Sequence, residues 1–436
     1  MTFMPYGFLL SVLLCGLVPF ASAQASDAAS ALSGGDSAWI LVSTVLVTLM
    51  LLPGVILFYS GMIRKKNALS ISVQTMTGGA ILSILWVICG YSLIFTPGTP
   101  FIGGLSKVML QHVSVTSVLD SVPNIPEVLF CVFELSFAAI TPVLVLGACA
   151  ERMNFSTAMW FIPAWSLLIY MPIGHMTWGP DGLFGTMGAM DFAGGLVVHI
   201  TSGFSSLVTA LMVGRRKDDG ITSLAPHNLI LTLSGGCLLW VGWFGFNGGS
   251  ALGANASAAM AILNTQIAAC AALCSWLVVE WKMYGKPSVL GAISGAIAGL
   301  VAITPGCGFV TPAGALIIGA LGGVACLWAV NWPKHRFHFD DALDVWAIHG
   351  VGGVLGAILT GVFASSSVAG EGKAGLLEGN WKQLLVQIEV TVFVALFTMV
   401  MTFIILTILK KTVGLCASEK QQLIGLDLTE HGEALR

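Results

Sequence analysis

The sequence predicts an all-α polytopic membrane protein, and three features lead to that fold class. Of the 436 residues, 56% are hydrophobic and only 9% are charged, whereas a soluble domain carries about a quarter charged residues. Apolar stretches long enough to span a bilayer recur along the chain. The 52 glycines suit helices packed closely in lipid. These features exclude a soluble enzyme and a disordered chain. The net charge of −3 leaves no basic field for nucleic acid.

The chain begins with the pattern of a signal peptide. Residues 7–20 form a short apolar run, and Ala21-Ser22-Ala23 follows with the small-x-small pattern of a signal-peptidase site. The alternative is a short first membrane span, but the run falls below the ~20 residues that a span needs. We therefore predict a signal peptide over residues 1–23, whose removal leaves the N-terminus outside.

Eleven apolar stretches predict eleven transmembrane helices. They lie near 38–61, 70–95, 127–149, 157–177, 196–213, 228–250, 257–281, 288–304, 313–332, 345–364 and 383–409. An odd number of spans from an outside N-terminus puts the C-terminus inside. Fifteen of the 18 basic residues then fall in inside loops or the tail, and only Lys107, Lys373 and Lys382 lie outside. This distribution is the one that the positive-inside rule expects.

The first ten spans allow two inverted five-helix repeats, because five spans reverse the orientation of the second half. The eleventh helix is then an addition. Asp191 precedes His199 on the fifth span and Asp344 precedes His349 on the tenth, which is a faint trace of such a repeat. We expect a membrane domain over residues 24–411 and a cytoplasmic tail over 412–436, which is too short for an independent domain.

His199 and His349 lie within apolar, glycine-rich spans. Such surroundings favour neutral imidazole, which has one donor and one acceptor nitrogen. Two readings stay open: the rings share a proton and line a narrow path, or they are packing histidines bonded to backbone carbonyls. No further His, Cys or carboxylate lies at ligand spacing on these helices, so the sequence predicts no metal and no cofactor.

Acidic residues open the same two spans. Asp191 stands at the start of the fifth span, where a carboxylate caps a helix and favours its positive end. Any effect of Asp191 on a cation is expected to be indirect. Asp340, Asp341 and Asp344 lie near the start of the tenth span, and at least one of them is expected to cap it.

Two aromatic runs also stand out, 240–250 and 133–137. Aromatic residues at a membrane interface usually form a belt. A cluster that faces a pore and includes a hydroxyl would instead bind a small cation through its π faces and a hydrogen bond.

Taken together, these runs resemble the ammonium transporter family (the Amt/Mep/Rhesus group), in its bacterial Amt-type branch. The resemblance extends in order from Trp39 to Glu433. Its matching segments are 53–59, 64–67, 150–152, 175–179, 191–199, 242–250, 295–300, 348–350, 425–427 and 431–433.

The resemblance implies an ammonium transporter or channel rather than an enzyme. Phe137, Trp178 and Ser250 match the family's outer ammonium-recruitment site. Phe137 and Phe246 match the pair of phenyl rings that gate the pore. Ammonium would then lose its proton and cross as ammonia, with or without the proton following.

The resemblance also implies roles for the polar residues and for partners. His199 and His349 match the twin pore histidines, and Asp191 matches the acid that supports the recruitment site without touching the ion. A homotrimer in the bacterial inner membrane is implied. So is a PII-type signalling protein that binds at the cytoplasmic side and makes residues 412–436 a regulatory tail.

Glu134 departs from the family pattern, which usually has Gln after the equivalent of Phe133. The carboxyl group could deepen cation recruitment, or it could be a protonated or paired core residue; the second is favoured.

The same residues bear on three rival functions. An ammonium sensor that acts through a separate cytoplasmic partner stays open. A redox or metal enzyme using His199 and His349 lacks further ligands, and a neutral gas or water channel would not need Trp178, Phe137 and Ser250.

Overall fold

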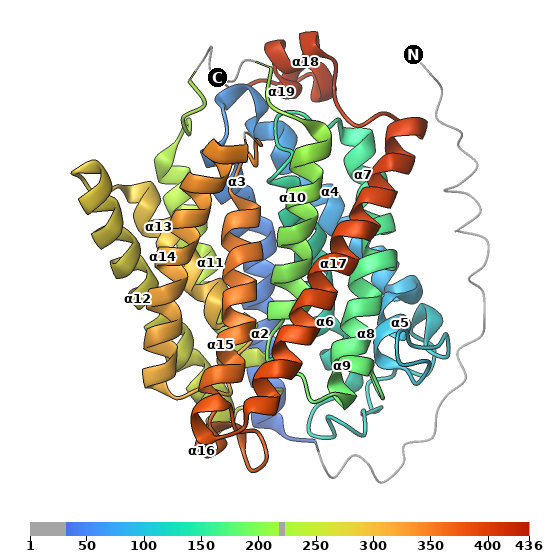
Figure 1. Ribbon diagram of the computed structural model, residues 1–436. Helices are drawn as coiled ribbons and strands as arrows, with labels where there is room; N and C mark the ends of the chain where they lie inside the picture. Colours follow the sequence, from blue (N-terminus) through green and yellow to red (C-terminus); the bar gives the residue numbers. More distant parts are fainter. Residues whose placement is uncertain (1–31, 218–222, 338, 436) are drawn as a thin grey trace.

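The computed structural model describes residues 32–217, 223–337 and 339–435, and Figure 1 shows them as a bundle of helices. The predicted signal peptide, residues 1–23, lies outside the described residues. Within the described residues, ten helical stretches are long and apolar enough to cross a membrane, and Val289–Ile303 is a shorter apolar helix. Each of the eleven predicted ranges coincides with one of these stretches.

The long stretches are built from the following elements: α2 (Gly34–Leu49), η2 (Met50–Val55), α3 (Ile56–Met62), η3 (Lys65–Asn67), α4 (Ala68–Leu85), η4 (Trp86–Gly90), α5 (Tyr91–Phe95), α6 (Glu127–Leu146), α7 (Phe155–Trp165), η6 (Ser166–Tyr170), α8 (Met171–Trp178), η7 (Gly195–Ile200), α10 (Thr201–Val213), α11 (Leu229–Gly249), α12 (Ala256–Tyr284), α13 (Val289–Ile303), α14 (Pro312–Phe337), η8 (Trp346–Val351), α15 (Gly352–Phe363) and α17 (Trp381–Thr412). Short elements complete the described fold: η5 (Val108–Leu110), α9 (Leu183–Thr186), α16 (Ser366–Ala369), η9 (Leu376–Glu378), α18 (Glu419–Ile424) and α19 (Leu426–His431). Figure 1 shows α17 running diagonally across the face of the bundle, where it packs on α7, α10 and α15.

The segments η2, η4, η6, η7 and η8 are π-helical turns inside or at the start of longer helices. Pro53 lies in η2, where a missing N–H interrupts the regular hydrogen-bond ladder. His199 lies in η7 and His349 in η8. Such turns occur often at functional sites.

A close approach of two backbones brings α10 against η8. A Cβ atom added to Gly203 would lie 2.1 Å from the nitrogen and 2.3 Å from the Cα of Gly350. No side chain fits into that space, and glycine therefore permits the contact. Because Gly203 is one turn from His199, and Gly350 is next to His349, this crossing brings the two histidines together.

One end of the bundle, which we call the vestibule end, carries the start of α2 and the loops before α6 and α12. The Asp36 carboxylate accepts hydrogen bonds from Ala254 N–H at 2.7 Å and from the Asn124 amide at 3.0 Å. Ser33 N–H donates to the Asn124 carbonyl at 2.9 Å. These bonds join three segments that are far apart in sequence.

The opposite end, which we call the tail end, is covered by α18 and α19 (Figure 1). Asp427 accepts hydrogen bonds from the N–H groups of Leu69 at 3.1 Å and Ser70 at 2.7 Å. Glu430 accepts one from Phe155 N–H at 2.8 Å. Two carboxylates of the tail therefore cap the first turns of α4 and α7, which lack intrahelical partners for their N–H groups.

A cluster of buried charges lies at the tail end. Arg216 bonds to Asp340 at 2.8 Å, and Arg152 lies 3.4 Å from the same carboxylate. Glu151 pairs with Arg64 and lies 3.7 Å from Arg216. Burial alone would raise the pKa of Asp340, but the charge of Arg152 and the hydrogen bonds and charge of Arg216 outweigh it and hold the pKa at about 2.

Candidate functional site

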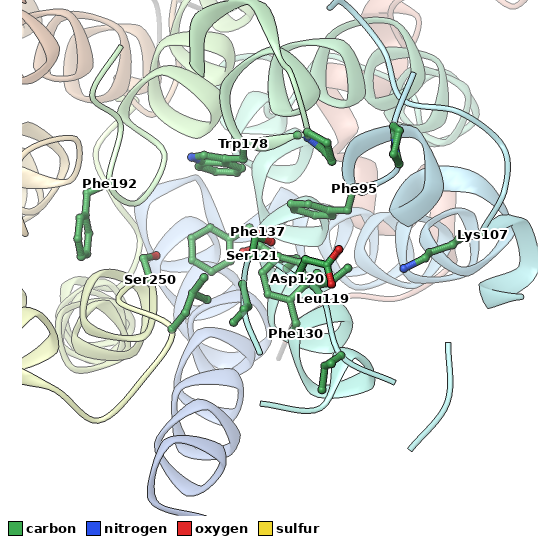
Figure 2. A pocket seen from close by; sticks show the side chains of 17 residues that line it. Phe95, Lys107, Leu119, Asp120, Ser121, Phe130, Phe137, Trp178, Phe192 and Ser250 are labelled. Carbon is green, nitrogen blue, oxygen red and sulfur yellow. The ribbon is translucent and has the colours of Figure 1, made fainter. Parts of the chain in front are cut away.

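Three cavities follow one another from the vestibule end to the tail end. The vestibule cavity, of about 650 Å³, is lined by Phe137, Trp178 and Ser250 among others (Figure 2). The central cavity, of about 30 Å³, is lined by Phe246, both histidines and apolar side chains. The tail-end cavity, of about 220 Å³, also reaches His349.

The three residues predicted to recruit a cation all line the vestibule cavity. The ring of Phe137 stands edge-on to Trp178 at 88°, with 6.4 Å between ring centroids. The Trp178 indole N–H donates to the Asp191 carbonyl at 3.1 Å. This bond holds the ring in place. The Ser250 hydroxyl donates to the Phe246 carbonyl at 2.8 Å, so its oxygen keeps lone pairs that can accept a hydrogen bond.

Two stacked phenyl rings separate the vestibule cavity from the central cavity. Phe137 and Phe246 lie 4.1 Å apart between centroids at an interplanar angle of 27°. Each is about 1% exposed. Because one ring lines the vestibule cavity and the other lines the central cavity, anything that passes between the two must displace the stack.

The two histidines meet in the central cavity. The Nδ1 atoms of His199 and His349 are 3.1 Å apart, a distance at which one nitrogen donates and the other accepts. The Nε2 atom of His199 is buried and has no hydrogen-bond partner. The alternative of packing histidines bonded to backbone carbonyls is wrong for His199, because its ring bonds to the other imidazole. Among the described residues, no group of three or more His, Cys, Asp or Glu is arranged to hold a metal.

Two side chains around the histidines were not among the predicted site residues. The Trp243 ring stacks on His199 with 5.4 Å between centroids, and its N–H donates to the Thr304 hydroxyl at 2.9 Å. Tyr59 lines both the central and the tail-end cavities. Trp243 lies three residues before Phe246, which puts both rings on one helix face. That spacing was the available signal for Trp243. Tyr59 ends the matching segment 53–59, to which no role in the site was assigned.

The Asp191 carboxylate lies at the start of η7. It accepts hydrogen bonds from four backbone N–H groups, those of residues 194–197, at 2.5–3.2 Å. The expectation that Asp191 caps this span is confirmed. Asp341 does the same for the tenth span, accepting from Trp346 N–H at 2.7 Å. The Asp191 carboxylate has its acceptor sites occupied, while its carbonyl orients Trp178.

The position of Glu134 differs from that expected for a paired core residue. It lines the vestibule cavity, and within the described parts of the chain its carboxyl group has no hydrogen-bond or ion-pair partner. Of the two forms of that expectation, the paired core residue is wrong, because the side chain lines the cavity and has no partner among the described residues. The protonated form stays a prediction.

Within the described residues, a bundle of membrane-length helices encloses a narrow, mostly apolar cavity between two wider ones, which is the architecture of a multi-pass membrane transport protein. Comparison with known sequences gives the family. A model of the Ammonium Transporter Family matches residues 38–435, and the chain belongs to that family.

Relatives and solved structures agree. An ammonium transporter of Bacillus subtilis is 46% identical over 403 residues, which cover 92% of this chain and 98% of that one. An ammonium transporter of Aquifex aeolicus is 44% identical, with 94% and 95% covered. The crystal structure of Candida albicans Mep2 has a TM-score of 0.85 at 36% identity and covers 91% of this chain and 89% of its own.

Proposed function

We propose that the protein recruits ammonium in the vestibule cavity and conducts ammonia, with or without its proton, through the central cavity past His199 and His349. The observation that carries this proposal is the order of the parts. An aromatic and hydroxyl-lined cavity is followed by the Phe137–Phe246 stack, and then by a narrow apolar space around the histidine pair.

Recruitment uses the aromatic faces of Phe137 and Trp178 and the oxygen lone pairs of Ser250. Phe137 and Trp178 replace part of the hydration of the ion by cation–π attraction, about 0.5–2 kcal/mol per contact. Ser250 accepts a hydrogen bond from an ammonium N–H, because its own proton is already donated to Phe246. Potassium gains the π attraction but has no hydrogen to donate, so Ser250 favours ammonium.

Passage beyond the gate favours the neutral molecule. A unit charge at the centre of a bilayer costs several kcal/mol, and the central cavity has an apolar lining apart from its histidines and Tyr59. Ammonia has a lone pair and three N–H groups, which suit the donor and acceptor nitrogens of a neutral imidazole pair. The unpartnered Nε2 of His199 offers it a place to bond.

The membrane arrangement belongs to the same proposal. The vestibule end faces outside and the tail end faces the cytoplasm of a bacterial inner membrane, with eleven spans that include α13. The first ten form two inverted repeats, which is supported by the matching capped π-helical turns η7 and η8. The protein is a homotrimer whose tail, residues 412–436, receives a PII-type partner.

The deciding experiment is an ammonium jump across proteoliposomes that contain the purified protein, with a potassium jump as the control. A saturable current for ammonium alone supports selective transport with net movement of charge. If no current flows, uptake of ammonia is followed by the internal pH, which rises when the neutral molecule enters. Absence of both signals would overturn the proposal.

A sensor that acts through a separate partner is the second candidate. A solved structure described as "Sensor Amt Protein" has a TM-score of 0.83 at 29% identity and covers 91% of this chain and 98% of its own. Saturable ammonium binding without flux in the same proteoliposomes would favour this function over transport.

A further inference from the structure

Glu134 belongs to the wall of the vestibule cavity. Phe130, Glu134 and Phe137 follow one another on α6 at the i, i+4, i+7 spacing of one helix face, and all three line the cavity. Because α6 runs from the vestibule end towards the tail end, Glu134 stands three residues, or about 4.5 Å along the axis, outside the gate ring Phe137.

Three neighbouring acids of the vestibule end have protein partners. Glu127 binds Lys107 and accepts a hydrogen bond from the Tyr91 hydroxyl at 2.8 Å. Asp191 and Asp36 accept backbone or amide N–H groups. Lys107 also lines the cavity, but it forms an ion pair with Glu127. Figure 2 shows Lys107 away from Trp178 and Ser250. Within the described residues, the half-buried carboxyl group of Glu134 has no such partner, and neither has Asp120, whose side chain is exposed.

A partly buried carboxylate without a protein partner must take its hydrogen bonds from whatever fills the cavity. Water can serve, but a small cation with N–H groups adds charge attraction and a charge-assisted hydrogen bond, which is about twice as strong as a neutral one. The aromatic faces of Phe137 and Trp178 favour the same kind of ligand.

We propose that the Glu134 carboxylate is a ligand for ammonium in the vestibule cavity, outside the gate. This rests on the proposed function and adds a charged contact to the recruitment site. Because the charge attracts any small cation, Glu134 raises affinity without discrimination, whereas the hydroxyl of Ser250 supplies the discrimination. The two contributions are therefore separable by mutation.

The test compares the half-saturating ammonium concentration in proteoliposomes for the native protein, Glu134→Gln, Glu134→Asp and Asp120→Asn. Gln keeps the size and polarity of Glu but removes its charge. Asp120 is the matched control, since it lines the same cavity but is exposed at its mouth. Elution of each variant as the native oligomer controls for folding.

We expect Glu134→Gln to raise the half-saturating concentration about tenfold, equivalent to about 1.4 kcal/mol, and to leave the maximal flux within twofold. The half-saturating concentration of Glu134→Asp should lie between those of the native protein and Glu134→Gln. That of Asp120→Asn should stay within twofold of the native value. The potassium concentration that inhibits ammonium uptake by half should rise by the same factor in Glu134→Gln. A native half-saturating concentration in Glu134→Gln would overturn the inference while leaving transport intact.

A binding measurement separates this inference from the proposed function. Crystals soaked in thallium(I), a monovalent cation that is visible by anomalous scattering, should hold the ion beside Glu134 in the native protein and lose it in Glu134→Gln. If the native protein transports no ammonium, the thallium peak beside Glu134 alone tests the inference. Its presence supports the cation site, and its absence refutes that site.

Discussion

The Nδ1 atoms of His199 and His349 face each other at 3.1 Å, and this fixes how many protons the pair can hold. An imidazolium carries a proton on both nitrogens. Two charged rings would therefore set N–H against N–H and lose the bond. The pair can accept at most one extra proton while it stays bonded, and one neutral pair presents one bare Nε2 and one Nε2–H.

The first prediction concerns this pair. His199→Ala or His349→Ala should lower ammonium flux at least tenfold, because each removes a polar group from an otherwise apolar passage and leaves the other ring without its partner. Proteoliposome flux measures the loss. His227→Ala is the control, since His227 bonds to the Ile63 carbonyl at 2.9 Å and lines none of the three cavities. Unchanged rate and selectivity would remove the histidines from the mechanism.

The second prediction concerns selectivity. Ser250→Ala should weaken ammonium binding several-fold and shift the ratio of ammonium to potassium affinity towards one, because the hydrogen-bond acceptor is lost and the π faces stay. Competition of potassium with ammonium uptake gives the ratio. Ser121→Ala is the matched control, since Ser121 lines the same cavity. An unaltered ratio in Ser250→Ala would assign selectivity elsewhere.

The third prediction concerns the helix crossing. Gly203→Ala should abolish transport, because its methyl group would lie 2.1 Å from the Gly350 nitrogen and force α10 and η8 apart. The displacement should also break the bond between the histidines. The measurements are flux and thermal stability in detergent. Gly34→Ala, where nothing lies within 4 Å, should match the native protein in both. Native flux in Gly203→Ala would contradict the crossing described here.

The fourth prediction concerns the charges at the tail end. Asp340→Asn should lower stability at pH 7 by at least about 2 kcal/mol, because the pKa of Asp340 is held at about 2 in the folded protein against about 3.9 when unfolded. Because the folded pKa lies below the unfolded pKa, ionised Asp340 stabilises the folded protein at pH values above the unfolded pKa. This stabilisation is lost as the pH falls through the folded pKa of about 2. The gap in melting temperature between the native and variant proteins should thus narrow from pH 4 towards pH 2.

A control and an opposing result accompany that pH series. Glu371→Gln removes the charge of an exposed acid and should leave the melting temperature unchanged at every pH. A gap for Asp340→Asn that stayed constant down to pH 3 would mean that packing, rather than ionisation, explains the effect of this residue.

Sequence patterns predicted the helices well because hydrophobic length decides membrane spans. The range near 127–149, for example, corresponds to α6 (Glu127–Leu146). The π-helical turns were not predictable, since one extra residue in a turn barely changes an apolar pattern. The acids at the start of the fifth and tenth spans were read correctly as caps, because capping is a local interaction.

The candidate site was less accessible from sequence. The bond between His199 and His349 joins residues 150 apart. Their apolar surroundings allowed a shared proton but left the alternative of packing histidines open, and the resemblance to the family favoured the pair. The environment of Glu134 depends on which face of α6 lines the cavity. Because α6 is apolar and buried on most sides, its sequence pattern does not distinguish that face. The contact of Arg152 with Asp340, 188 residues later in the chain, was likewise not visible in the sequence.

The capping of α4 by Asp427 has a consequence for how the chain is assembled. The acceptor for Ser70 N–H is made 357 residues after its donor, and Glu430, which serves α7, follows later still. During synthesis both helices are therefore inserted with incomplete first turns, and the bundle closes at this end only after α17 has been made. A ribosome-stalled intermediate that stops before Asp427 should exchange its Ser70 amide hydrogen faster than the completed chain does.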